Sequence, residues 1–211
     1  MSSVTDIDGN IYDTVKIGNL LWTTSNLRVT RFNNGLAIDK NSGFCSYNYD
    51  DLISKKFGHL YSCGSIWHSN TAQTFDYQPE HHVIQSLLPP LGWEIPTLDD
   101  WISLKATLGI GKPNLTDNCS YNYCSPEIEH TMKSIDSWEI GGNGSNESGL
   151  NILAGGFLSY ERKFLDLNRC ATIWLGTVSG PDLDHYHIIS VGINSSHVIP
   201  EMASVRVVKR C

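Results

Sequence analysis

Residues Gly92-Trp93-Glu94-Ile95-Pro96-Thr97-Leu98-Asp99-Asp100-Trp101 form the most informative stretch of the chain. Pro96 ends any preceding strand because it has no amide hydrogen to donate to a strand ladder. Thr97 suits the N-cap of a helix, since its hydroxyl can accept a hydrogen bond from a free amide of the first turn. The two aspartates then place negative charge at the positive end of the helix dipole. The stretch therefore predicts an extended segment that runs directly into a helix.

Apolar side chains continue this helix at spacings of three and four. They are Leu98, Trp101, Ile102, Leu104 and Leu108. Such a stripe marks a single buried face. Gly109, Gly111 and Pro113 then end the helix. We expect one amphipathic helix of about three turns, whose apolar face is ordinary core.

The composition narrows the class of the protein. Of 211 residues, 40% are hydrophobic, and 18% are charged, below the level of about a quarter that is usual in soluble domains. Asn, Ser, Thr, Gly and Tyr replace the missing charge, which favours a loop-rich, β-rich body. The formal net charge of −7 argues against a nucleic-acid partner, because phosphate contacts need clustered cations. No apolar run approaches the length of about 18 residues that membrane insertion requires.

The N-terminus and the cysteines leave several alternatives open. Residues 1–6 have neither a basic start nor an apolar run, so they do not form a signal peptide. The chain either stays in a cytoplasm, leaves by cell lysis, or has lost a leader. Six cysteines at positions 45, 63, 119, 124, 170 and 211 form no Cys-x-x-Cys pair, which argues against a zinc cluster. Cys119 and Cys124 could bridge within one polar loop, and disulfides and free thiols are equally open.

The N-terminal half predicts a hairpin, a loop and two helical segments. Ile11 to Val15 and Leu20 to Thr24 alternate as the strands of a hairpin do. Residues 43–51 are rich in Tyr, Asn and Asp and indicate a loop. Residues 62–72, with Ile66 and Trp67, indicate a first helix, and residues 81–88 a short helical turn.

The C-terminal half is β-rich. After a weak helix over residues 127–134 and a Gly-Asn-Ser loop over residues 141–149, we expect four strands, over residues 150–159, 171–177, 186–193 and 203–210. We see no internal repeat and no linker between domains. One α+β domain over residues 1–211 fits this order, with two helices packed on a late antiparallel sheet and long loops.

The order of these pieces resembles the Fibrobacter succinogenes major paralogous domain family, which has a C-type-lectin-like fold. The resemblance covers nearly the whole chain and rests on an ordered set of stretches. They are Asp8-Gly9-Asn10-Ile11-Tyr12, Thr14 to Asn19 with Trp22, Ser25-Asn26-Leu27-Arg28, Phe32-Asn33-Asn34-Gly35, Tyr47-Asn48-Tyr49-Asp50, Gly58-His59-Leu60-Tyr61, Gly92 to Thr97 with Trp101, Asn143 to Leu150, Ala154-Gly155-Gly156-Phe157, Ile173-Trp174 and Ser204 to Val208.

The resemblance implies a lectin-like fold with adjacent termini, two helices and a late sheet that displays variable loops. Such domains occur on bacterial surfaces and in phages of gut Bacteroidetes, and some are targets of diversity-generating retroelements. The family often has one cysteine before the Gly-Trp segment and another in the final strand. Here Leu87-Leu88 and Val207 stand in those places. If those cysteines pair in relatives, both partners are apolar in this chain, so we carry over no disulfide.

Metal and catalytic chemistry find little support in the residues. In a strand, His185 and His187 would share one face and could offer two ligands to a transition metal, yet we expect exposed polar side chains instead. The loop over residues 141–149 offers oxygen ligands to calcium but only one carboxylate, so we expect turn formation and no cofactor. The formylglycine-generating branch of the fold needs paired cysteines, for which Cys170 and Cys211 are candidates. Their flanking residues do not resemble that branch, so we expect no enzyme.

The polar segment between Trp174 and Val198 is the candidate binding surface. It is rich in Tyr, His, Ser, Asn and Asp, which make adaptable contacts at low ordering cost. The resemblance also places the variable surface of the family here. The candidate residues are Trp174, Asp182, Asp184, His185, Tyr186, His187, Asn194, Ser195, Ser196 and His197. The alternative is a pair of ordinary solvated loops that flank a strand.

We therefore expect a non-catalytic binding module that recognises a cell-surface glycan or protein receptor. Its expected location is a virion, such as a phage tail appendage, or a bacterial surface. The alternative is a virion structural subunit (tail, fibre or capsid decoration) that contacts other subunits, with a homo-oligomer as one form. An exposed apolar patch would favour the structural alternative.

Overall fold

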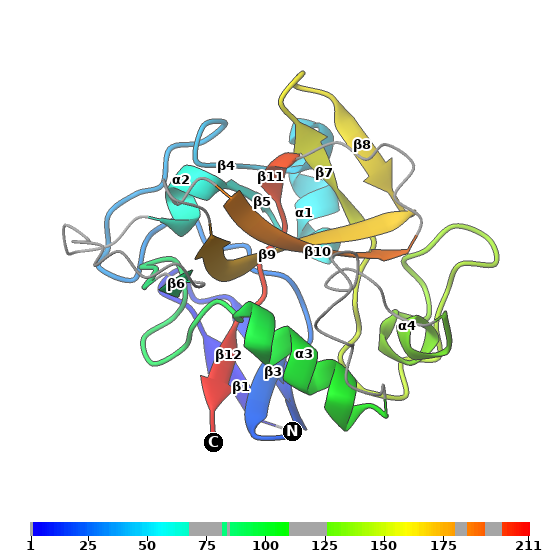
Figure 1. Ribbon diagram of the computed structural model, residues 1–211. Helices are drawn as coiled ribbons and strands as arrows, with labels where there is room; N and C mark the ends of the chain where they lie inside the picture. The colour runs from blue at the N-terminus through cyan, green and yellow to red at the C-terminus, as the bar shows by residue number, and fades with distance from the viewer. Residues whose placement is uncertain (1, 68–81, 84, 110–125, 180–184, 193–199) are drawn as a thin grey trace.

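The structure is a computed structural model that describes residues 2–67, 82–83, 85–109, 126–179, 185–192 and 200–211. Within these residues, two β-sheets and several short helices form a mixed α+β body (Figure 1). The α+β class predicted from the sequence is therefore correct. None of the helices in the described ranges is long and apolar enough to cross a membrane.

The first sheet has the strand order β1-β2-β3-β12 and is antiparallel throughout. Its strands are β1 (Ser2–Thr5), β2 (Ile11–Ile17), β3 (Leu20–Thr23) and β12 (Val208–Arg210). The predicted hairpin is confirmed as β2 and β3, which pair Val15 with Trp22. Because β12 pairs with β3, both ends of the described chain belong to this sheet, as its two edge strands, and both are seen at the bottom of Figure 1.

The second sheet has eight strands, and six of them follow the order β10-β9-β7-β11-β5-β4. Strand β6 also pairs with β9, and β8 with β7. The strands are β4 (Phe44–Cys45), β5 (Leu60–Ser62), β6 (His82–Val83), β7 (Gly155–Ser159), β8 (Phe164–Leu167), β9 (Cys170–Ser179), β10 (His185–Gly192) and β11 (Pro200–Ala203). The expected late antiparallel sheet needs two corrections. It also contains the early strands β4 and β5, and β7 and β9 pair in parallel.

The helices agree with the prediction only in part. Helix α3 (Leu98–Thr107) and helix α4 (Pro126–Met132) occupy predicted segments. The predicted helix over residues 62–72 shrinks to α2 (Cys63–Ile66), and residues 68–72 lie outside the described ranges. Residues 82–83 form β6, where a helical turn was expected. The expected loop over residues 43–51 instead contains β4 and the 3-10 helix η1 (Tyr47–Tyr49), and helix α1 (Asp51–Phe57) follows it unpredicted.

Helix α3 begins as its sequence predicts. The Thr97 hydroxyl accepts a hydrogen bond from the Asp100 amide at 3.2 Å, and the Asp100 carboxylate accepts one from the Thr97 amide at 2.9 Å. This reciprocal capping box satisfies two amides at the helix start. The Leu98 amide donates to the Thr177 hydroxyl of β9 at 2.9 Å, so the sheet also holds the helix start.

The core consists of two large apolar clusters. The first joins Trp22 of the first sheet, Trp101 of α3 and Val191 of β10, and the two indole rings meet edge to face at 6.5 Å. The second cluster includes Leu88 and Val207, and the partly buried Leu87 packs against it. Leu88 and Val207 are both buried, so the places where the family resemblance suggested cysteines belong to the apolar core.

The predicted strand over residues 203–210 is interrupted. Strand β11 ends at Ala203 and β12 begins at Val208, with Arg206 between them and only 2% exposed. Its guanidinium donates hydrogen bonds to one side-chain amide oxygen and three backbone carbonyl oxygens, those of Asn26, Thr23, Leu150 and Asn151. Leu150 and Asn151 turn their carbonyls toward this cation, and the strand expected over residues 150–159 begins only at Gly155.

Candidate functional site

The predicted binding surface centres on β10, the strand at one end of the six-strand path of the second sheet. Strand β10 pairs with β9 from His185 opposite Ser179 to Gly192 opposite Cys170. The register shifts between Tyr186 and Ile188, so His187 stands at an irregularity of the ladder. Irregularities of this kind re-aim side chains and concentrate at sheet edges and binding sites.

The described residues include only part of the predicted set. His185, Tyr186 and His187 lie on β10, and the His187 side chain is half-buried. Six further residues lie outside the described ranges: Asp182, Asp184, Asn194, Ser195, Ser196 and His197. Strand β10 spans about 23 Å at the usual rise per residue, and these six residues flank its two opposite ends. The two predicted loops are therefore attached at opposite ends of this strand.

Trp174 belongs to the core and offers no binding surface. Its side chain is 2% exposed, and its indole nitrogen donates to the Tyr61 carbonyl at 2.8 Å. On β9, Ile173 and Leu175 face the first apolar cluster while Trp174 and Val178 face the second. Strand β9 is therefore buried on both faces, which explains why its tryptophan cannot reach a ligand.

The described residues bear on the metal-binding alternatives. No group of three or more His, Cys, Asp or Glu side chains in the described ranges is arranged to hold a metal ion. In the loop over residues 141–149, Asn143 Oδ1 accepts from the Trp138 amide at 3.0 Å and Asn146 Oδ1 accepts from the Asn151 amide at 2.7 Å. Both amide oxygens therefore stabilise turns.

The four cysteines that can be described are free thiols: Cys45, Cys63, Cys170 and Cys211. Cys45 and Cys170 are buried, and burial raises the pKa of the Cys45 thiol to about 11 and that of Cys170 above its usual value. Such thiols are protonated and weakly nucleophilic at neutral pH. The predicted loop pair Cys119 and Cys124 lies outside the described ranges.

A charged groove that the sequence did not reveal lies beside the opposite end of the six-strand path. It has a volume of about 700 Å³ and draws its lining from five segments of the chain. Its lining includes Arg28, Lys40, Phe44, Asp51, Lys55 and His59. Three of these are cations and one is a carboxylate, so the groove is net positive in a chain of formal charge −7.

Three polar contacts shape this groove. The Arg28 Nε donates to Asn10 Oδ1 at 2.9 Å, which positions the guanidinium. The Asp51 carboxylate accepts from the Ser46 hydroxyl at 2.8 Å and lies 3.6 Å from Lys40 Nζ. The hydrogen bond from Ser46, and then the Lys40 charge, hold the pKa of Asp51 below its usual value, so Asp51 is a carboxylate at neutral pH.

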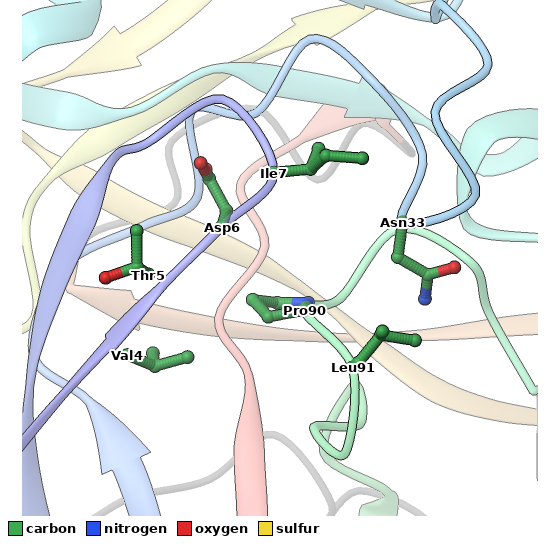
Figure 2. A pocket seen from close by; sticks show the side chains of 7 residues that line it. All are labelled: Val4, Thr5, Asp6, Ile7, Asn33, Pro90 and Leu91. Carbon is green, nitrogen blue, oxygen red and sulfur yellow. The ribbon is translucent and has the colours of Figure 1, made fainter.

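A smaller pocket of about 310 Å³ lies where three segments meet (Figure 2). Residues 4–7 form one wall, Asn33 a second, and Pro90 with Leu91 a third. Leu91 is 81% exposed and Ile7 40% exposed. The pocket therefore presents apolar side chains to solvent, which is typical of a contact surface.

Comparison with known proteins gives one match. The model of the Fibrobacter succinogenes major domain matches residues 15–209 of the chain. No curated protein and no solved structure matches it.

Proposed function

The chain belongs to the Fibrobacter succinogenes major domain family, and on that premise we propose that it is a non-catalytic binding module for a cell-surface glycan or protein receptor. The observation that carries this proposal is the position of β10. It ends the six-strand path of its sheet, and its irregular ladder at His187 lies within the run His185, Tyr186 and His187. Tyrosine and histidine at such an edge make contacts that combine an apolar ring with a polar atom.

We further propose that the fold is C-type-lectin-like. Two features support this assignment. The two ends of the described chain share the first sheet. Strands β9 and β10 lie at one end of the six-strand path of the second sheet, and each is followed in the sequence by a polar segment. The proposed setting is a bacterial surface or a phage appendage, in keeping with the family. The proposed diversity of the late loops follows from the same family resemblance.

The test is binding to whole Bacteroidetes cells and to a glycan array. A variant with Tyr186→Ala and His187→Ala is compared with a control variant that carries Tyr160→Ala and Glu161→Ala. The control residues are exposed, and they stand on the turn between β7 and β8, away from β9 and β10. We expect binding to be lost in the first variant and kept in the control, with equal melting temperatures. Equal binding by both variants, or none by the unchanged protein, rejects the proposal.

The pocket of Figure 2 favours a second function, that of a virion or surface-appendage structural subunit. Its exposed Leu91 and Ile7 would be covered by another subunit or a second copy of the chain. Light scattering during size-exclusion chromatography measures the oligomeric state and so tests this second function directly. A stable oligomer that dissociates on Leu91→Glu supports the structural function, and a monomer at high concentration excludes self-assembly through this pocket.

A further inference from the structure

The groove between Arg28, Lys55 and His59 is a site separate from the proposed receptor surface. None of its lining residues stands on β9 or β10. It lies beside β4, and β4 and β10 occupy opposite ends of the six-strand path. Its ligand can therefore be tested independently of the β10 surface.

His59 supplies the first observation that points to a ligand. The side chain is only 8% exposed and lines the groove, and its Nδ1 atom is buried without a hydrogen-bond partner in the described residues. The ring is fixed by Phe44 at a centroid distance of 4.8 Å and by Tyr61 at 6.3 Å. A buried polar ring atom without a partner is costly in a folded protein, so it marks a site where a role beyond packing is expected.

The cations supply the second observation. Arg28 and Lys55 form no ion pair with any carboxylate in the described ranges, whereas Lys40 is partly neutralised by Asp51 at 3.6 Å. Two uncompensated cations converge on one concavity of an acidic chain. The positive potential of this groove attracts anions, whereas the net negative charge of the whole chain attracts cations.

The remaining lining residues favour a sugar over a simple anion. Asn10, Thr30 and Asp51 contribute amide, hydroxyl and carboxylate groups to the groove, while the Phe44 and His59 side chains that border it are only 5% and 8% exposed. Amide, hydroxyl and carboxylate groups exchange hydrogen bonds with sugar hydroxyls. An inorganic anion would leave the Asp51 carboxylate unused.

We propose that this groove binds an acidic saccharide, with the sugar carboxylate between Arg28 and Lys55 and the sugar hydroxyls toward Asp51. Guanidinium and ammonium groups form charge-assisted hydrogen bonds with carboxylates. Asp51 accepts hydrogen bonds from sugar hydroxyls. The inference goes beyond the proposed receptor surface because it names a second site and a ligand class.

The probe is a galacturonic acid trisaccharide, measured by calorimetry at physiological salt. Its methyl ester, which has the same rings without the negative charges, is the second probe. Lys55→Gln is the test variant and Lys56→Gln the matched control, since both lysines are exposed on α1 and only Lys55 lines the groove. Arg28→Gln is the second test variant.

We expect the acid to bind and the ester to bind at least about tenfold more weakly, because the charge-assisted contacts are lost. Lys55→Gln and Arg28→Gln should each weaken binding of the acid by about tenfold, and Lys56→Gln by less than about twofold. The Tyr186→Ala, His187→Ala variant should bind the acid normally, so failure at one site is distinguishable from failure at the other.

Three results would overturn the proposal. Equal binding of acid and ester would show that the cations do not contact the ligand. Tighter, Lys55-dependent binding of a glutamate-rich peptide would assign the groove to acidic protein segments. Absence of binding by the unchanged protein at millimolar trisaccharide would leave the groove without a saccharide ligand.

Discussion

At the scale of single residues, His59 makes the stability of the fold depend on pH. Burial lowers the pKa of His59 to about 4, with Lys40 and Arg28 adding to the shift and Asp51 and Asp8 opposing it. In the unfolded chain the His59 imidazole is protonated near pH 6.5, whereas in the native protein it is protonated only near pH 4. Stability is therefore fully present above pH ~6.5 and falls as pH drops toward 4, by about 3 kcal/mol.

Urea unfolding at pH 7 and at pH 4.5 measures this dependence. In His59→Gln the loss of unfolding free energy between the two pH values should shrink by about 2 kcal/mol, because the titrating group is gone. The control is His130→Gln, since His130 is exposed on α4. An unchanged pH dependence in His59→Gln would show that His59 is not the group responsible.

Arg206 provides the second prediction at this scale. Burial lowers the pKa of Arg206 to about 9, so the guanidinium is still charged at neutral pH, and it donates hydrogen bonds to four oxygen atoms. Arg206→Met would leave those buried oxygens without donors and should cost about 4 kcal/mol of unfolding free energy. Arg210→Met is the control. Its side chain is 61% exposed and its ion pairs should contribute less than about 1 kcal/mol. Similar losses in both variants would contradict the prediction.

The sequence pattern failed at Arg206 for a physical reason. A polar residue between Val205 and Val207 predicts an outward-facing side chain in a strand. The guanidinium instead donates hydrogen bonds to carbonyls of residues more than 50 positions away. The residues next to Arg206 in the sequence give no indication of these contacts.

At the scale of elements, helix α3 gives a prediction about its first turn. Thr97→Ala removes the hydroxyl that accepts from the Asp100 amide, so it should cost about 1–2 kcal/mol of unfolding free energy. Thr107→Ala is the matched control, because Thr107 is exposed and bonds only within the helix, to the Ser103 carbonyl. Thermal unfolding of the two variants measures the loss of stability in each. A Thr97→Ala protein as stable as Thr107→Ala would mean that the Thr177 contact alone fixes the helix start.

Elements that depend on local signals were predicted correctly, and elements that depend on distant partners were not. The capping residues and apolar stripe of α3 stand within one segment, and β2 and β3 form a hairpin. In contrast, β6 is a strand because it pairs with β9 across almost 100 positions. The pair β4 and β5 joins the second sheet through β11, which is also remote in sequence.

At the scale of the whole molecule, the first apolar cluster contains side chains from both sheets. It contains Val208 from the first sheet and Val191 from the second. Calorimetry should therefore show one unfolding transition, and Val208→Ala and Val191→Ala should each shift that same transition downward, by about 1–2 kcal/mol. Two transitions that respond separately to the two variants would divide the chain into two domains.

The candidate sites differ in how far sequence could predict them. The polar run around β10 was visible because its residues are consecutive. The charged groove gathers residues between positions 10 and 59 from five segments, without a spacing that links Arg28 to His59. Only the fold brings those side chains together, so no pattern in the chain could have indicated them.

The pairing of β3 with β12 also orders events during synthesis. The paired residues run from Trp22 with Val208 to Leu20 with Arg210, so they lie 186 to 190 positions apart. At the usual rate of roughly 5–20 residues per second, the open edge of β3 waits on the order of 10–40 seconds for its partner on the ribosome. During that time its backbone groups can pair with any other exposed strand. The nascent chain is therefore the state in which this protein is most exposed to misassembly, and its first sheet closes only after Arg210 has left the exit tunnel.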